Sequence, residues 1–415
     1  MSQTEELHST FENYKSMSLD LNMERGQPSD ANFDLSLKLL SVIDESNYIT
    51  DSGVDIRNYP GGTTGLVEAR EMFSELLRVQ ASEVMVGNNS SLELMGHFLS
   101  WALLRGVKDS TSSWIGQKPK LIVTVPGYDR HYGLASQLGY ELLTVPMTAE
   151  GPDIEAVEAL ARQDASVKGI YFVPTYSNPT GDTVSEEVAT RLVSMQTAAA
   201  DFCIFADDAY AVHHLVDQPV EAPNLLSLAK AHGNADRVIL FGSTSKVTFA
   251  SAGISLAGMS EANIQYWSKL FSAHSIGPNK AEQWRHVCFL RQYPDGLKGL
   301  MKQHAKLLKP KFEVVEEVLN DQLGNKNLAR WSSPEGGYFV SVDTQRPIAD
   351  QVVALAAELG VSLTPAGATF PGGIDPNNTN IRLSPTRPST EQVRRAMEVF
   401  CCCVELASHE YDQAQ

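Results

Sequence analysis

Short, almost wholly apolar runs alternate with amphipathic stretches through the middle of the chain. The apolar runs cover residues 83–86, 121–125, 141–145, 169–173, 202–206, 237–241 and 253–257. Between them, apolar side chains recur at helical spacing over residues 91–104, 153–162, 185–199 and 224–231. Strands that are apolar on both faces and alternate with helices are typical of a mostly parallel sheet covered on both sides. We therefore predict an α/β fold with a mostly parallel, seven-stranded central sheet.

The pattern changes after residue 278. One long helical pattern covers residues 302–323, strand-like runs cover 337–342 and 380–383, and helical patterns cover 349–359 and 390–406. A chain of 415 residues exceeds the usual size of a single core. We expect a large domain of residues 50–302 and a smaller α+β domain formed by residues 303–415 together with the N-terminal segment 1–49.

Composition narrows the class of protein. The formal net charge of -17 argues against nucleic-acid or anionic-membrane partners. No run approaches the roughly 20 apolar residues that span a bilayer, and the acidic first 14 residues do not resemble a secretory signal. The three consecutive cysteines at 401–403 cannot converge on one metal ion from a helix, so we expect them to pack in the core. We predict a cytoplasmic protein with small-molecule partners and no metal site.

Three motifs follow predicted strands, where the chemistry of parallel sheets collects. They are Ser-Thr-Ser-Lys at 243–246, Asp-Asp-Ala-Tyr at 207–210 and Ser-Asn-Pro-Thr-Gly at 177–181. The amine of Lys246 can form a Schiff base. A buried Asp207 needs a cationic partner, which a protonated pyridine nitrogen would supply. Together these motifs predict a site for pyridoxal 5'-phosphate (PLP).

Each of these residues also has a simpler interpretation. Lys246 alone would be read as an exposed lysine, and Asp207 as a helix cap or an ion-pair partner. Asn178 lies in a sequence that also predicts a plain turn. In the functional interpretation, Tyr210 and Asn178 hydrogen-bond the ring oxygen of the cofactor. Tyr128 would stack on the ring face, although it could equally be a core aromatic residue.

Anion-binding groups complete the predicted site. Ser90 and Ser91 open a helix, whose free N–H groups suit a phosphate, although serine also caps helices routinely. Ser243 and Ser245 flank the lysine and suit the same phosphate. Arg382 lies in an apolar strand, where its guanidinium would pair with a substrate carboxylate or form a structural salt bridge.

These motifs together resemble the fold-type I PLP-dependent aminotransferases, most of all the aspartate aminotransferase group typified by corynebacterial enzymes. The resemblance runs from Gly26 to Arg382. Its further markers are Arg-Gly with Pro-Ser at 25–29, residues 55–59, 90–92, 126–131 and 209–213, and Gly-Pro-Asn-Lys at 277–280.

The resemblance implies roles for these residues. Lys246 would hold the cofactor as a Schiff base, and Asp207 would pair with its ring nitrogen. Tyr59 would reach the phosphate of a neighbouring subunit, which implies a homodimer with shared active sites. Arg382 would hold the substrate α-carboxylate, with Asn178 beside it, and the backbone at Gly26 would help to cover it.

The function implied is transfer of an amino group between an L-amino acid, for which we expect aspartate, and 2-oxoglutarate. The freed amine of Lys246 would act as general base, with Asp207 and Tyr210 completing the catalytic set. An alternative on the same scaffold is PLP-dependent β- or γ-elimination or replacement in specialised biosynthesis. A third reading, an effector-binding module of a DNA-binding regulator, is disfavoured because residues 1–51 are too short and too acidic for a winged DNA-binding domain.

The chain departs from the resembling enzymes at two places. Many carry a phosphate-gripping arginine seven or eight positions after the lysine, where this chain has Gly253 and Ile254. The bacterial relatives place an arginine just before the Gly-Pro-Asn-Lys motif, where this chain has His274. Histidine is shorter and only partly charged near neutrality. The contact to a substrate side-chain carboxylate is therefore left open between Arg57, Arg130 and Lys280.

Overall fold

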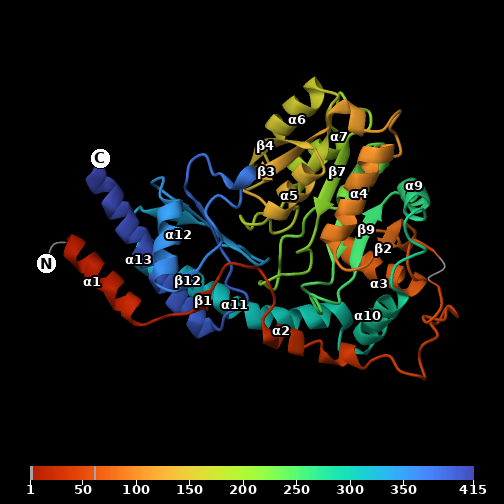
Figure 1. Cartoon of the computed structure of the whole chain (residues 1–415). Helices are drawn as coiled ribbons and strands as arrows, with labels where there is room; N and C mark the ends of the chain where they lie inside the picture. Colours follow the sequence, from red (N-terminus) through yellow and green to blue (C-terminus); the bar gives the residue numbers. More distant parts are fainter. Residues whose placement is uncertain (1–2, 60–61) are drawn as a thin grey trace.

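The computed structural model describes residues 3–59 and 62–415 of the chain. Figure 1 shows two packed parts, one built around a large sheet and a smaller one that contains both chain ends. The helices are α1 Gln3–Ser16, α2 Asp30–Asp34, α3 Val67–Leu77, α4 Ser91–Arg105, α5 Asp129–Gln137, α6 Ile154–Gln163, α7 Glu186–Ser194, α8 Leu225–Ala231, α9 Glu261–Phe271, α10 Lys280–Gln292, α11 Gly296–Leu323, α12 Ala349–Glu358 and α13 Thr390–Ala414. The strands are β1 Leu21–Asn22, β2 Val84–Val86, β3 Lys120–Val125, β4 Glu141–Thr148, β5 Gly151–Pro152, β6 Val167–Phe172, β7 Cys203–Asp207, β8 Val238–Ser243, β9 Ser255–Met259, β10 Ala329–Trp331, β11 Val340–Thr344, β12 Val361–Ser362 and β13 Asn380–Leu383.

The large sheet confirms the predicted α/β class. Its strand order is β2-β9-β8-β7-β6-β3-β4-β5. Strands β4, β3, β6, β7 and β8 run parallel, whereas β9 is antiparallel to both of its neighbours. All seven predicted strands are present, and β5 adds a short edge strand antiparallel to β4. Strand β5 has only two residues, Gly151 and Pro152, which are too few to show a hydrophobic period in the sequence.

Helices cover both faces of this sheet and form a separate apolar cluster on each. Strand β7 shows the alternation that a strand imposes. Ile204 and Ala206 pack in the cluster with α3, α6, α7, α8 and α10, whereas Cys203 and Phe205 pack in the one with α4, α5 and α9. Asp207, the last residue of the strand, is therefore directed to the face that carries α4 and α5.

The smaller part contains the antiparallel sheet β10-β11-β13, which is packed with α11, α12 and α13. Its apolar cluster includes Phe11, Leu21 and the three cysteines 401–403. All three cysteines are buried and free, which confirms their predicted packing role. Helix α11 begins at Gly296 and not at residue 302, directly after a left-handed turn at Asp295 and Gly296. It continues through Pro310.

The N-terminal residues contribute to both parts. Leu39 and Val42 pack in one cluster of the large sheet, whereas Phe11 and Met23 pack in the cluster of the smaller part. The domain division at residues 49 and 302 stays a prediction. Among the described residues, no helix is long and apolar enough to cross a membrane. The same residues contain no group of His, Cys, Asp or Glu side chains suited to hold a metal ion.

Candidate active site

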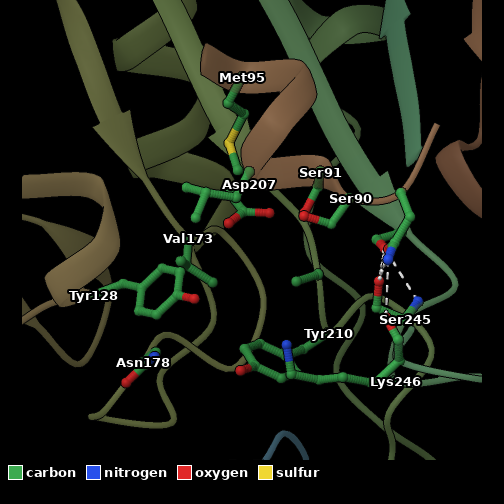
Figure 2. A pocket seen from close by; sticks show the side chains of 15 residues that line it. Ser90, Ser91, Met95, Tyr128, Val173, Asn178, Asp207, Tyr210, Ser245 and Lys246 are labelled. Carbon is green, nitrogen blue, oxygen red and sulfur yellow. Dashed lines mark hydrogen bonds between the residues drawn. The ribbon is translucent and has the colours of Figure 1, made fainter. Parts of the chain in front are cut away.

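A cavity of about 260 Å³ lies at the carboxyl ends of β7 and β8, beside the N-terminus of α4. Figure 2 shows Asp207 and Lys246 pointing into it from opposite sides, with Tyr128 and Asn178 at one end. Except for Tyr59, the predicted cofactor-binding residues line this cavity, namely Ser90, Ser91, Tyr128, Asn178, Asp207, Tyr210, Ser243, Ser245 and Lys246.

Asp207 is a buried carboxylate with one unused oxygen. Its Oδ2 accepts a hydrogen bond from Nε2 of His131, at 2.9 Å, and both side chains are almost fully buried. Its Oδ1 is buried and has no partner among the described residues. A buried acceptor without a partner costs about 1–3 kcal/mol. The geometry therefore leaves Asp207 able to bind a cationic or N–H donor placed in the cavity.

His131 was missed as a site residue by the sequence analysis. It lies in the first turn of α5 and stacks on Tyr171 of β6, with ring centroids 3.7 Å apart. Its ring also meets Tyr128 edge-on at 5.0 Å. Its sequence signals were its position three residues after Tyr128 and its place in the 126–131 marker of the resemblance. The contact with Asp207 depends on how α5 packs on the sheet, which the local pattern does not reveal.

Lys246 lies in the turn after β8, and buried histidines hold the backbone of this turn. Nε2 of His213 donates to the Lys246 carbonyl at 3.4 Å, and Nε2 of His304 lies 3.0 Å from the Val247 carbonyl. Because Asn32 donates to Nδ1 of His304 at 2.9 Å, the Nε2 of His304 carries the proton. The N-terminal helix α2 and the long helix α11 thus meet at the lysine turn.

His286 holds the same turn from α10. Its Nδ1 donates to the Glu282 carbonyl, and its Nε2 accepts from Thr244 and Thr248, at 3.0 and 2.9 Å. Burial lowers the pKa of His286 to about 4. This imidazole is therefore neutral at ordinary pH and acts as a fixed hydrogen-bonding group.

The amine of Lys246 sits against aromatic rings inside the cavity wall. Its Nζ lies 5.1 Å from the ring centre of Tyr210 and 6.0 Å from that of Tyr338. Burial lowers the pKa of Lys246 below its usual range, while the Asp207 carboxylate opposes this shift. A lowered amine pKa increases the fraction of the unprotonated, nucleophilic form.

The hydroxyl groups at the other end of the cavity surround a helix N-terminus. Ser90 is the N-cap of α4 but makes no capping bond with its side chain, so its hydroxyl stays available. Ser245 bonds Ser243 at 2.8 Å and Asn89 at 3.1 Å. A Cβ at Gly253 would lie 2.9–3.0 Å from Ser245 atoms, so the absent side chain lets the two segments approach. Free N–H groups and hydroxyls together suit a phosphate.

Arg382 extends from β13 toward the opposite end of the cavity. Its Nη1 donates to Asn178 at 3.2 Å and to Asp129 at 3.1 Å. Its guanidinium lies 4.8 Å from the ring centre of Phe339. Since Oδ1 of Asn178 accepts from Arg382, the Nδ2 of Asn178 remains as a donor in the cavity.

Gly26 packs against the tip of the Phe339 ring. A Cβ at Gly26 would lie 2.3 Å from Cζ of Phe339, so only glycine fits this approach. The segment around it is hydrogen-bonded to the small part, through Thr364 to the Glu24 carbonyl and Thr386 to the Gln27 carbonyl, both at 2.8 Å. The structure therefore brings Gly26 and Arg382 together through Phe339.

Several predicted contacts lie elsewhere in the chain. Tyr59 is 74% exposed and does not line the cavity of its own chain. Lys280 is buried and donates to the carbonyls of Asp55 and Tyr59, at 2.9 and 2.6 Å. Arg57 pairs with Asp55 at 2.8 Å.

His274 and Arg130 complete this group. His274 lines a separate cavity of about 300 Å³, where Trp101 donates to it at 3.1 Å and His97 packs against it. Arg130 has a 60% exposed side chain at the start of α5. Arg57 is as exposed, at 63%, but Arg130 is the candidate that adjoins Asp129, a partner of Arg382.

The chain is similar to known proteins over almost its full length. A family model described as "Aspartate amino-transferase" matches residues 1–415. The chain is 40% identical to an aspartate aminotransferase of Corynebacterium glutamicum over 408 residues, which cover 98% of this chain and 94% of that protein. The crystal structure of an aspartate transaminase from C. glutamicum superimposes with a TM-score of 0.95 at 40% identity and covers 98% of this chain and 96% of that one.

A more distant structure shares the fold alone. It is LysN, an α-aminoadipate aminotransferase of Thermus thermophilus complexed with N-(5'-phosphopyridoxyl)-L-leucine. Its TM-score is 0.76 at 20% identity, with 94% of this chain and 93% of that chain covered.

Proposed function

The chain belongs to the aspartate aminotransferase family, and from this premise we propose that it binds PLP through Lys246 and transfers the amino group of L-aspartate to 2-oxoglutarate. The chain is an aminotransferase of the aspartate aminotransferase type. Its particular cofactor contacts and substrates are the content of the proposal.

The observation that carries the proposal is the buried, unpaired Oδ1 of Asp207 opposite the amine of Lys246. The residues around the cavity fit PLP group by group. Asp207 suits a protonated ring nitrogen, and Tyr210 with Nδ2 of Asn178 suits the ring oxygen. The helix N-terminus at Ser90 and Ser91 suits the phosphate. Ser243 and Ser245 add hydroxyl donors where this chain lacks the arginine of many relatives.

The residues of the chain would divide the chemistry among them. When bound, PLP supplies an electron-accepting ring that takes up the pair released as the substrate Cα–H bond breaks. Asp207, oriented by His131, keeps a negative charge at the ring nitrogen. The lowered pKa of Lys246 leaves its amine able to take and return the Cα proton as general base.

Arg382 would orient the substrate for that proton transfer. Its guanidinium is fixed by Phe339, Thr364 and Asn178, and a guanidinium pairs with a carboxylate through two parallel hydrogen bonds. This would place the α-carbon between the cofactor and Lys246. Aspartate as the donor is supported by 40% identity over nearly the full length to the C. glutamicum enzyme. Arg130, which is exposed and adjoins Asp129, is our candidate for the contact to a side-chain carboxylate.

We further propose a homodimer in which Tyr59 contacts the neighbouring site. The 74% exposure of this large aromatic side chain, outside the cavity of its own chain, supports the proposal. A cytoplasmic location is also proposed, since the five cysteines are free and buried, as a reducing compartment allows.

The reaction is tested by incubating the purified protein and PLP with 2-oxoglutarate and each amino acid in turn. Formation of glutamate, fastest with aspartate, is the expected result. Glutamate formed best from another donor would contradict the aspartate assignment only. Release of a side-chain leaving group without glutamate would instead favour elimination or replacement on the same residues.

Lys246→Ala tests the covalent site directly. The variant should lose the visible absorption of lysine-bound PLP, and borohydride reduction followed by peptide mapping should mark residue 246 in the wild type only. Labelling of any other lysine, or an unchanged spectrum in the variant, would overturn the assignment.

A further inference from the structure

Arg382 is engaged by three side chains before any substrate arrives. A guanidinium has five N–H groups. Nε donates to Thr364 at 3.3 Å, and Nη1 donates to Asn178 at 3.2 Å and to Asp129 at 3.1 Å. Over the part of the chain that the structure describes, Nη2 meets no acceptor. The arginine therefore has two fully occupied nitrogens, Nε and Nη1, and one free nitrogen, Nη2.

A bidentate carboxylate needs two neighbouring nitrogens of the guanidinium. If it binds across both Nη atoms, it must replace either Asn178 or Asp129 at Nη1. If it binds across Nε and Nη2, it must replace Thr364, while Asp129 stays bound to Nη1 of the same guanidinium. In either case the substrate carboxylate and the Asp129 carboxylate share one cation, and like charges at such a distance repel.

Asp129 is the acceptor that can leave. Asn178 and Thr364 are 2% and 4% exposed. The Thr364 hydroxyl is also tied to the Glu24 carbonyl. The Asp129 side chain is 36% exposed and lies in the first turn of α5, at the rim of the site. A charged carboxylate with access to water can turn outward at lower cost than a buried neutral group.

We propose that Asp129 competes with the substrate carboxylate for Arg382 and thereby sets the affinity of the site for every α-carboxylate ligand. This inference rests on the proposed role of Arg382 and goes beyond it. In the free protein Asp129 neutralises a guanidinium whose side chain is only 8% exposed. On binding, the ligand must displace or repel that carboxylate, which lowers affinity for amino acids and 2-oxo acids alike.

The test uses Asp129→Asn, which keeps an acceptor oxygen but removes the charge. Glu93→Gln is the matched control, because Glu93 is an exposed carboxylate in the first turn of α4 and lines the separate cavity of His274. The probe is succinate, an unreactive dicarboxylate, titrated by calorimetry into the PLP-loaded protein. We expect Asp129→Asn to bind succinate about 5-fold tighter, the size of a partly exposed ion pair. Glu93→Gln should leave the Kd unchanged.

Two further variants separate the possible causes. Arg382→Ala should abolish most of the succinate binding, and adding Asp129→Asn to it should then have no effect, since the two residues act through one interaction. A tightening that persists without Arg382 would mean that Asp129 acts through general charge and would overturn the inference. Equal or weaker succinate binding by Asp129→Asn alone would overturn it as well.

Thermal unfolding gives a second readout. Asp129→Asn should unfold at a lower temperature than the wild type without ligand, and succinate should raise its Tm by more than it raises that of the wild type. If the variant does not fold, Asp129→Ser, which keeps a hydroxyl in the same helical turn, takes its place. If Arg382→Ala binds succinate with the same Kd as the wild type, the proposed role of Arg382 in holding the substrate carboxylate is wrong, whatever Asp129 does.

Discussion

At the scale of single residues, Phe339 lies against both Gly26 and Arg382. Gly26→Ala would place a methyl group 2.3 Å from the present position of Cζ of Phe339, so the ring must move. Overpacking of this kind costs about 1–3 kcal/mol. Because the ring supports the guanidinium, we expect KM for both the amino acid and the 2-oxo acid to rise about 10-fold.

Gly116→Ala is the control, since a Cβ at that position would have no neighbour within 4 Å. Steady-state kinetics with both substrates and a melting curve distinguish the two variants. If Gly26→Ala folds and its KM values are unchanged, Phe339 does not hold the Arg382 guanidinium in place.

The sequence could predict the residues whose neighbours along the chain define their motif. Lys246, Asp207 and Asn178 each follow a strand in a recognisable string, and the structure brings them to one cavity. It could not predict His131 or Asp129 as contacts. Their partners Asp207 and Arg382 are 76 and 253 positions away. Such pairings are set by how helix α5 packs, and no local period records that.

At the scale of elements, helix α11 carries a buried lysine whose ammonium has a carbonyl as its partner. Nζ of Lys311 donates to the Thr386 carbonyl at 2.6 Å, and burial lowers the pKa of Lys311 to about 8. The unfolded chain keeps this proton up to its ordinary pKa of 10.5. Between pH 8 and 10.5 the unfolded state binds more protons, so the free energy of unfolding gains a contribution as pH rises.

Lys311→Met should remove that contribution. We therefore expect the difference in unfolding free energy between variant and wild type to move in favour of the wild type from pH 7.5 to pH 10, measured by urea denaturation. Lys302→Met, at an exposed position of the same helix, should give a constant difference. A constant difference in Lys311→Met as well would contradict the lowered pKa.

Element boundaries show where hydrophobic pattern stops being informative. The sequence placed the start of α11 at residue 302, whereas the helix begins at Gly296. The turn at its start has left-handed backbone at Asp295 and Gly296. In the sequence, the glycine is the one residue of the two that indicates this conformation. Helix α10 was not predicted at all. Its buried residues include Gln283 as well as the apolar Trp284, so the buried positions do not follow the apolar, helical period that would identify a helix in the sequence.

At the scale of the whole molecule, distant elements converge on the lysine turn through neutral histidines. Burial lowers the pKa of His286 and His304 to about 4 and that of His213 to about 3. The unfolded chain protonates these rings near their ordinary pKa of 6.5. As pH falls from 6.5 toward 4, the unfolded state therefore binds more protons and the native state loses stability.

His286→Asn should destabilise the protein at pH 7 by about 1–3 kcal/mol, because the buried Thr244 hydroxyl loses its acceptor, whereas Thr248 keeps the Thr244 carbonyl. The difference in unfolding free energy between wild type and variant should become smaller as pH falls, because only the wild type must keep this buried ring neutral. Unfolding free energies at pH 7 and pH 5 measure both values. A difference that stays constant or widens toward pH 5 would contradict the neutral form of His286.

The central sheet was more predictable than the packing of the N-terminal segment. Alternation of apolar strands and amphipathic helices gave the parallel sheet, because that pattern depends only on neighbours along the chain. The path of the N-terminal residues was not predictable in the same way. Leu39 and Val42 pack with the large sheet while Phe11 packs with the small part, and few periodic residues in this segment indicate either contact.

The two-sided packing of strand β7 has a consequence for changes in chain length. Odd positions face α4 and α5, and even positions face α3, as far as Asp207 at its end. Deleting one codon within the strand would bring Asp208, and no longer Asp207, to the position that faces the cavity, and inserting one codon would bring Ala206 there. Either change would also bury the apolar side chains before or after it on the wrong sides. Insertions and deletions can accumulate in the loops that flank β7. Within the strand, only one register puts each side chain on its proper face of the sheet.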